Sequence, residues 1–141
     1  MKENCEVGYR HISTLANYHG DKFLIIEVMK ILALVAHDYR KADIVELAIH
    51  NAEFLSHHHI VCTGTTGNLV RKAMEEKGVT ADIACMHSGP LGGDAEIAAM
   101  VVRKEIDLAV ALIDDFNPQP HEADIQMLLR QCRVHNVPIA C

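Results

Sequence analysis

Two short segments rich in glycine and hydroxyl side chains have the composition of an anion-binding site. The first, Thr63-Gly64-Thr65-Thr66-Gly67-Asn68, follows an apolar run and precedes a helical pattern. The second, Ser88-Gly89-Pro90-Leu91-Gly92-Gly93-Asp94, follows another apolar run. Glycine lets the backbone approach a ligand closely, and a helix start offers free N–H groups and a partial positive charge. Together the two segments predict a site for a phosphate ester.

The hydroxyl groups of these segments suit a phosphate. Thr63, Thr65, Thr66 and Ser88 can each donate a hydrogen bond to a phosphate oxygen. Helix capping is the alternative use of such hydroxyls, but it would occupy only one of the three threonines. Neither segment has the G-x-x-x-x-G-K-[ST] or the G-x-G-x-x-G spacing, so neither indicates a nucleoside triphosphate or dinucleotide site.

Charged and titratable residues, among them His37, Asp38 and Lys41, follow the first apolar run. Lys41 lies four residues beyond His37, about one turn into a predicted helix. A lysine there would bring positive charge to the phosphate site, although a solvated surface lysine explains it equally well. Asp38 at the start of that helix also has an ordinary explanation, because the helix dipole stabilises a carboxylate there.

Acid–base chemistry is indicated by Asp94, Asp114 and His121. Phosphate repels a carboxylate such as Asp94, so a carboxylate at a phosphate site is expected to have a chemical role. The alternative explanation is that the dipole at a helix start stabilises the Asp94 carboxylate. Asp114 ends an aliphatic run and is expected to be partly desolvated. The turn 117–120 holds two prolines and places His121 at a helix start. An aspartate base, a neutral histidine and a phosphate cradle suit proton abstraction next to a carbonyl group.

The elements that would position these residues alternate along the chain. The pattern predicts strands at residues 31–36, 60–62, 81–86, 107–113 and 137–140, with helices at 38–56, 67–77, 93–104 and 121–136. We therefore expect a single-domain α/β fold, a three-layer αβα sandwich around a five-stranded, mainly parallel sheet. In such sheets ligands bind outside the carboxyl ends of the strands, and the polar segments above all fall at that edge.

Length, composition and net charge limit the kinds of protein that this chain could be. A chain of 141 residues is long enough for one domain, and a net charge of −6 argues against general nucleic-acid binding. The apolar stretch 23–36 is too short and too charged to span a membrane, so we expect a cytoplasmic protein. Residues 1–28 have no clear pattern and are interpreted as an N-terminal extension before a domain at 29–141.

Cysteine and histidine usage predicts no metal site. The five cysteines include no C-x-x-C pair and are expected to be reduced thiols, none with the local setting of a nucleophile. The run His57-His58-His59 lies away from the polar edge, and adjacent histidines point in different directions. We expect these three side chains to be exposed to solvent.

The combination of segments resembles the methylglyoxal synthase family. The resemblance extends from about residue 29 to residue 141, and no single segment would suffice for it. The matching positions are 33–38, 63–68, 88–94, 117, 120–124, 128–130 and 134–138.

The resemblance implies an activity and a set of roles. Members of the family are carbon–oxygen lyases that convert dihydroxyacetone phosphate to methylglyoxal and inorganic phosphate through an enediolate. They need no metal or cofactor and are usually homohexamers; phosphate is the product and a potential inhibitor. The resemblance implies that Asp94 is the general base, that His121 is a hydrogen-bond donor and proton shuttle, and that His37 lies near the reacting oxygens. It also implies that Asp114 and Asp124 support His121 or the developing charge. The implied phosphate ligands are Lys41, Thr63, Gly64, Thr65, Thr66, Ser88 and Gly89.

Two departures from the family pattern bear on function. Asp115 and Phe116 stand where the family usually has proline and leucine, which adds a negative charge near the site. Family members also continue beyond the last strand into a final helix that supplies an arginine to the phosphate site. The sequence ends at Cys141, so we expect this domain to lack that tail. Similar domains also serve as non-catalytic sensors of phosphate esters, which stays open as the alternative function.

Overall fold

The computed structural model describes the backbone of residues 11–18 and 21–141 and the side chains from Met29 onward. Strands β1 (His11–Tyr18) and β2 (Asp21–Val28) pair antiparallel with each other. Both lie within the segment that the sequence pattern leaves unassigned. The division at residue 29 into an extension and a domain stays a prediction.

A five-stranded sheet forms the centre of the domain. Its strands are β3 (Ile31–Ala36), β4 (His59–Cys62), β5 (Asp82–Cys85), β6 (Leu108–Leu112) and β7 (Ile139–Ala140). They lie in the order β5-β4-β3-β6-β7, and every pairing between them is parallel. The expected parallel α/β architecture is confirmed.

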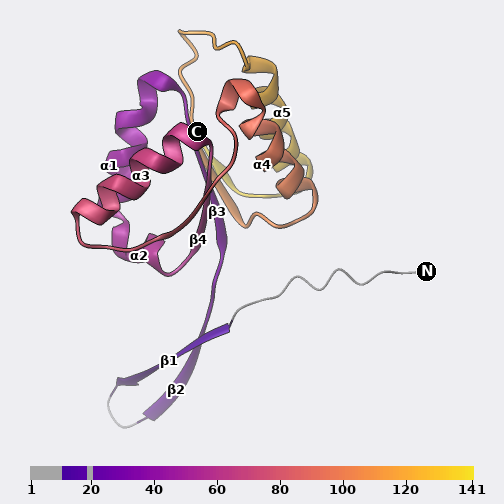
Figure 1. The fold of residues 1–141 in the computed structure, drawn as a ribbon. Coiled ribbons are helices and arrows are strands. Elements are labelled where there is room, and N and C mark those ends of the chain that lie inside the picture. The colour runs from indigo at the N-terminus through magenta and orange to yellow at the C-terminus, as the bar shows by residue number, and fades with distance from the viewer. Residues whose placement is uncertain (1–10, 19–20) are drawn as a thin grey trace.

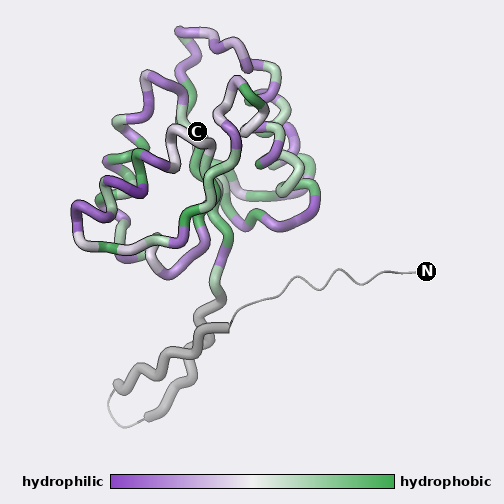
Figure 2. Tube along the Cα trace, in the orientation of Figure 1, coloured by the Kyte–Doolittle hydropathy of each residue, from purple (hydrophilic) through white to green (hydrophobic). Residues whose placement is uncertain are grey.

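Helices cover both faces of this sheet (Figure 1). On one face lie α1 (Lys41–His50), α2 (Ala52–Ser56) and α3 (Gly64–Glu76), and on the other α4 (Gly93–Val102) and α5 (Glu122–Val134). Successive side chains of β3 point to opposite faces of the sheet. Leu32 and Leu34 therefore pack in one hydrophobic core, and Ala33 and Val35 pack in the other. Figure 2 accordingly shows the most hydrophobic backbone along the strands between the helix layers.

Two helical segments differ from their predicted bounds by more than a shift of about two residues at one or both ends. Helix α3 begins at Gly64 rather than residue 67, so most of the first glycine-rich segment forms a helical turn rather than a loop. The predicted helix 38–56 is divided into a 3₁₀ turn, η1 (Asp38–Arg40), followed by α1 and α2. The break between α1 and α2 lies at Asn51, whose side-chain amide donates to the Leu47 carbonyl at 2.8 Å and competes with the helical pattern.

The histidine run also differs from expectation. Only His57 is exposed, whereas His58 is buried against Phe54 and accepts a hydrogen bond from the Lys30 N–H at Nδ1. His59 is half-buried and contacts the Asp82 carboxylate at 2.8 Å. Within residues 29–141, none of the helices is long and apolar enough to cross a membrane.

Chain order explains where the polar segments meet. The chain builds β3, β4 and β5 outward on one side, then returns to place β6 on the other side of β3. The segments that follow β3 and β6 therefore flank the point where the strand order reverses, the usual ligand-binding position in open parallel sheets. All four predicted polar segments begin at the carboxyl ends of β3, β4, β5 and β6, so the site lies at this edge.

Candidate active site

A cavity of about 260 Å³ opens at the carboxyl edge of the sheet. This volume is below the range of about 300–1,000 Å³ typical of sites for drug-sized ligands, so it suits a small substrate. Its lining comes from four separate segments of the chain. The lining residues are Val35, Ala36, His37, Asp38, Lys41, Thr63, Thr65, Ser88, Gly89, Pro90, Asp94 and His121.

Two glycines of the second segment aim Asp94 into this cavity. Gly92 has a φ of 99°, a left-handed conformation that reverses the chain between the 3₁₀ turn η2 (Gly89–Leu91) and α4. A Cβ atom on Gly93 would lie 1.9 Å from the His87 carbonyl oxygen, so only glycine allows that approach. Asp94 follows directly in the first turn of α4 and is directed inward.

The Asp94 carboxylate is buried without hydrogen-bond partners. Its side chain has no exposed surface, and neither Oδ1 nor Oδ2 accepts a hydrogen bond from the described residues. Burial raises the pKa of Asp94; the nearby Asp124 carboxylate adds to this effect, while His121 and His37 oppose it. An unsatisfied buried carboxylate is costly to the fold, which is typical of a group kept for chemistry.

His121 faces this carboxylate from the start of α5. Its Nε2 atom lies 3.4 Å from Asp94 Oδ2, and its Nδ1 atom is buried without a partner among the described residues. The close fit depends on Gly89, where a Cβ atom would lie 2.5 Å from His121 Nε2 and 3.0 Å from Asp94 Oδ2. The predicted base and the predicted histidine are therefore brought into direct contact.

The second histidine of the cavity, His37, is held in one tautomer. Its Nδ1 atom accepts a hydrogen bond from the Asp114 backbone N–H at 3.0 Å, so a neutral ring carries its proton on Nε2. That Nε2 atom is buried without a partner in the described residues. The two rings meet edge to face with centroids 6.2 Å apart. His37 thus offers a free N–H donor beside the Asp94–His121 pair.

The hydroxyl groups gather on a different wall of the cavity. Thr63 and Thr65 line it from the start of α3, and Ser88 lines it from the start of η2. Thr63 makes no side-chain capping hydrogen bond at the N-terminus of α3, and none of the described side chains caps it, so the threonine hydroxyls are not used for capping. Thr63 instead donates to the buried Thr66 hydroxyl at 3.3 Å, which orients Thr63 within the wall.

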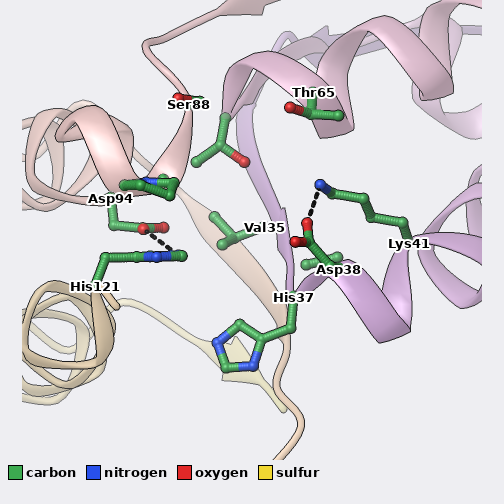
Figure 3. A pocket seen from close by; sticks show the side chains of 12 residues that line it. Val35, His37, Asp38, Lys41, Thr65, Ser88, Asp94 and His121 are labelled. Carbon is green, nitrogen blue, oxygen red and sulfur yellow. Dashed lines mark hydrogen bonds and ion pairs between the residues drawn. The ribbon is translucent and has the colours of Figure 1, made fainter. Parts of the chain in front are cut away.

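Lys41 supplies the positive charge of this wall. Its side chain is 20% exposed and pairs with the Asp38 carboxylate, which is 72% exposed. Figure 3 shows Lys41 and Thr65 on one side of the cavity and Asp94 with His121 on the other. A ligand that spans the cavity would therefore place an anionic end near Lys41 and a reactive end near Asp94.

Four predicted site residues do not line the cavity. Thr66 and Gly64 lie behind its wall, where the Gly64 N–H donates to the His87 carbonyl at 3.1 Å. The Asp114 carboxylate accepts from the Asn117 amide and, to a lesser effect, from the Phe116 N–H, and these hydrogen bonds hold the pKa of Asp114 below its usual value. Asp124 affects the site through its charge, which acts on Asp94.

Known proteins similar to this chain identify its family. The family model of the MGS-like domain matches residues 43–141. A methylglyoxal synthase of Treponema socranskii is 72% identical over 110 residues, which cover 78% of this chain and 70% of that protein. The chain belongs to the methylglyoxal synthase family. A relative from Yersinia enterocolitica, also a methylglyoxal synthase, is 43% identical over 82% of this chain and 72% of its own length.

A solved methylglyoxal synthase has the same fold. The crystal structure of the enzyme from Elizabethkingia anophelis NUHP1 superposes with a TM-score of 0.69 at 39% identity and covers 80% of this chain and 71% of that one. At this identity the family resemblance extends beyond the fold.

In this methylglyoxal synthase family member, a pair of residues that the sequence pattern does not indicate supports the site. Glu96 accepts the His87 backbone N–H at 2.8 Å and contacts the His87 ring at 2.9 Å; these contacts hold the pKa of Glu96 below its usual value. His87 directly precedes Ser88, and its carbonyl accepts from Gly64. The pair therefore connects the two glycine-rich segments with α4. Its only sequence signal is an acid in the first turn of a helix, which dipole stabilisation already explains.

Replacement of Glu96 tests this connection. Glu96→Ala is expected to raise KM several-fold with a smaller change in kcat, because the Ser88 wall loses its anchor while Asp94 and His121 stay in place. Glu96→Gln should restore most of the loss, since its amide oxygen still accepts the His87 N–H. Steady-state kinetics of both variants provide the measurement. Equal KM values for Glu96→Ala and the parent protein would contradict the anchoring role.

Proposed function

We propose that this protein converts dihydroxyacetone phosphate to methylglyoxal and inorganic phosphate, which makes it a carbon–oxygen lyase. One observation carries the proposal: the fully buried Asp94 carboxylate, which accepts no hydrogen bond from the described residues, lies 3.4 Å from His121 and across the cavity from Lys41. A base at one end and an anion site at the other match a substrate with an acidic C–H bond and a phosphate group.

Asp94 would act as the general base. It removes a proton from the carbon next to the carbonyl group, and the electron pair of that C–H bond forms the enediolate. The free Nε2–H of His37 and the ring of His121 would donate to the two enediolate oxygens, and His121 would pass a proton between them. Asp114 would contribute through its backbone N–H, which fixes the His37 tautomer.

The opposite wall would hold the leaving group. The enediolate expels phosphate as the C–O bond breaks, and this step is fastest when that bond stands perpendicular to the enediolate plane. Lys41, Thr63, Thr65 and Ser88 would fix that orientation and stabilise the departing charge, with support from the N–H groups at the starts of α3 and η2. Phosphate binding at the same wall would also make the product an inhibitor.

The non-catalytic alternative is less consistent with the geometry. A sensor of phosphate esters needs the wall of Lys41 and Thr65 but not a base. Burying the Asp94 carboxylate without a hydrogen bond lowers the stability of the fold and adds nothing to phosphate binding. The Gly89 contact with both Asp94 and His121 likewise supports proton transfer rather than binding alone.

A coupled assay tests the proposed activity. The purified protein is mixed with dihydroxyacetone phosphate, and released phosphate and methylglyoxal are measured in the same reaction. Equal amounts of both products are expected, because each elimination yields one of each. Phosphate release without methylglyoxal would indicate a phosphatase, and binding without turnover would favour the sensor function.

Activity and stability should depend on pH in opposite directions. Because burial raises the pKa of Asp94 and the base must be ionised, kcat/KM is expected to rise with pH through that raised value. Between the ordinary aspartate pKa and the raised pKa of folded Asp94, the unfolded chain has already lost this proton while the folded chain keeps it. The free energy of unfolding therefore falls as the pH rises through this window. The measurements are kcat/KM and Tm from about pH 4 to about pH 9. An acid limb at the ordinary aspartate pKa would contradict the assignment.

We also infer a cytoplasmic homohexamer. Phe116 and Leu91 are exposed apolar side chains that follow β6 and β5 at the cavity edge, where contact between subunits would cover them. Light scattering of the purified protein measures the subunit number. A monomer at micromolar concentration would contradict the hexamer but not the reaction.

A further inference from the structure

The ammonium group that would bind phosphate is already paired with a carboxylate. Among the cavity-lining residues in the described part of the chain, only Lys41 has a permanent positive charge. Its Nζ atom donates to Asp38 Oδ1, and Asp38 lies three residues earlier, at the start of the η1 turn that leads into α1. Figure 3 shows this pair on the side of the cavity where Thr65 lies. A phosphate group that needs Lys41 must therefore compete with Asp38.

The charges of the cavity lining make this pairing unexpected for an anion site. Asp38 and Asp94 bring two carboxylates to the lining, and Lys41 brings one ammonium group. Once Asp94 is ionised, the negative charges exceed the positive ones, although the proposed substrate is itself an anion. Asp94 has a role as the base. Asp38 has no such role, and its charge lowers the affinity of the site for phosphate.

The two partners of this ion pair differ in exposure. The Lys41 side chain is only 20% exposed, whereas the Asp38 side chain is 72% exposed. A carboxylate that water already reaches can leave its partner at little cost in desolvation, while the lysine stays within the cavity wall. The hydrogen bond and the charge of Lys41 hold the pKa of Asp38 below its usual value, so Asp38 is ionised at neutral pH.

We propose that Asp38 is a displaceable counter-ion of Lys41. It pairs with the ammonium group in the empty site, leaves it when a phosphate group binds and returns to it when phosphate dissociates. Asp38 thereby sets the affinity of the wall formed by Lys41, Thr63, Thr65 and Ser88. The inference rests on the proposed function for the identity of the substrate and the product.

This exchange would help the site to release its product. Before elimination, the phosphate group is part of a substrate that His37 and His121 also hold. After the C–O bond breaks, only the wall that contains Lys41 holds inorganic phosphate. A competing carboxylate weakens the binding of substrate and product by the same factor, so it leaves the chemical step unchanged. It shortens the time for which the wall retains the product.

A purely structural role for Asp38 leads to a different expectation. An ion pair between residues three apart can stabilise a helical turn, although an exposed pair of this kind contributes little. Loss of a structural partner would disorder Lys41 and weaken phosphate binding. Loss of a competitor would strengthen it. The sign of the change in phosphate affinity therefore distinguishes the two roles.

The same segment offers a matched control for Asp38. Asp43 Oδ2 lies 2.9 Å from Arg40 Nη1, also three residues apart, and the Asp43 side chain is 48% exposed. Neither Arg40 nor Asp43 lines the cavity. Asp43→Asn therefore removes the same charge from the same segment without freeing Lys41.

The test measures binding of inorganic phosphate to the full chain by calorimetry. We expect Asp38→Asn to lower the Kd for phosphate about threefold to fivefold, because Lys41 no longer has a competing partner. Asp38→Glu keeps the charge and should stay near the parent value, and Asp43→Asn should leave the Kd unchanged. In turnover assays, the KM for dihydroxyacetone phosphate and the inhibition constant for phosphate should fall by similar factors in Asp38→Asn.

Several results would overturn the proposal. They are unchanged or weaker phosphate binding in Asp38→Asn, equal tightening in Asp43→Asn or Asp38→Glu, and the absence of phosphate binding to the parent protein. A crystal structure of the parent protein with inorganic phosphate tests the exchange without any variant. Phosphate should contact Lys41 Nζ, and the Asp38 carboxylate should have left it. An Asp38–Lys41 pair that persists beside bound phosphate would also overturn the proposal.

Two outcomes separate this inference from the proposed function. If Asp38→Asn binds phosphate more tightly but the parent protein forms no methylglyoxal, the counter-ion role stands and the proposed function fails. If the parent protein forms methylglyoxal and Asp38→Asn binds phosphate no more tightly, the proposed function stands and the counter-ion role fails.

Discussion

Asp94→Asn is expected to lower kcat for methylglyoxal formation by about 10²–10⁴-fold, the range typical for removal of a general base. Asparagine matches the size of aspartate, so the cavity keeps its shape, but an amide cannot accept the substrate proton. The neutral amide also removes the cost of burying a charge, so the variant should be more stable than the parent protein near neutral pH.

Three measurements make this prediction specific. Phosphate binding, followed by calorimetry, should persist in Asp94→Asn because the Lys41 wall is untouched. Thermal denaturation should give a Tm no lower than that of the parent protein. Asp82→Asn is the matched control, since Asp82 is an exposed carboxylate at the opposite end of β5 and its loss should leave kcat unchanged. An unchanged rate in Asp94→Asn would mean that another group is the base.

Gly89→Ala should have the second largest effect, a fall in kcat of about 10²-fold, because displacement of a catalytic group by about 1 Å can cost that much. The added methyl group would lie 2.5 Å from His121 Nε2 and 3.0 Å from Asp94 Oδ2, so the imidazole must move away from the carboxylate. Gly89 does not have a positive φ, so the backbone itself accepts alanine and the effect falls on the site.

Gly78→Ala provides the contrast for Gly89→Ala. Gly78 follows the end of α3 with a φ of 75°, and apart from its two chain neighbours none of the described residues has an atom within 4 Å of the position that an added methyl group would take. Alanine there strains the backbone without meeting a neighbour. It should cost roughly 1–2 kcal/mol of stability and leave kcat unchanged. If both variants lost stability alone, the contact of Gly89 with His121 would have no catalytic importance.

Much of the fold follows from local pattern. A run of six aliphatic residues such as Ile31–Ala36 has no polar face, so it is stable only as a strand covered on both sides, and repetition of this motif requires a parallel sheet with two helix layers. The rule that ligands bind at the carboxyl ends of parallel strands then placed Asp94, His121 and Lys41 at one edge. These inferences need only the periodicity of side chains and the chirality of the backbone.

Other features depend on contacts between residues far apart in the chain. The sequence does not distinguish the roles of Thr63, Thr65 and Thr66. Because α3 begins at Gly64, Thr63 and Thr65 line the cavity while Thr66 is buried. The His37 tautomer depends on a backbone N–H that lies 77 residues away. The contact of Cys85 with Arg71 likewise depends on how α3 lies against the edge strand.

The order of residues in this chain specifies a parallel α/β domain and the kinds of group at its polar edge, because those properties arise from local hydrophobic pattern and side-chain chemistry. The folded packing specifies which of those groups touch, which are desolvated and which are left without partners. Asp94, a candidate base by its sequence position, lies buried against His121 because Gly89, Gly92 and Gly93 allow that close packing. Desolvation and close contact are properties of three-dimensional packing, so no pattern along the chain could reveal them.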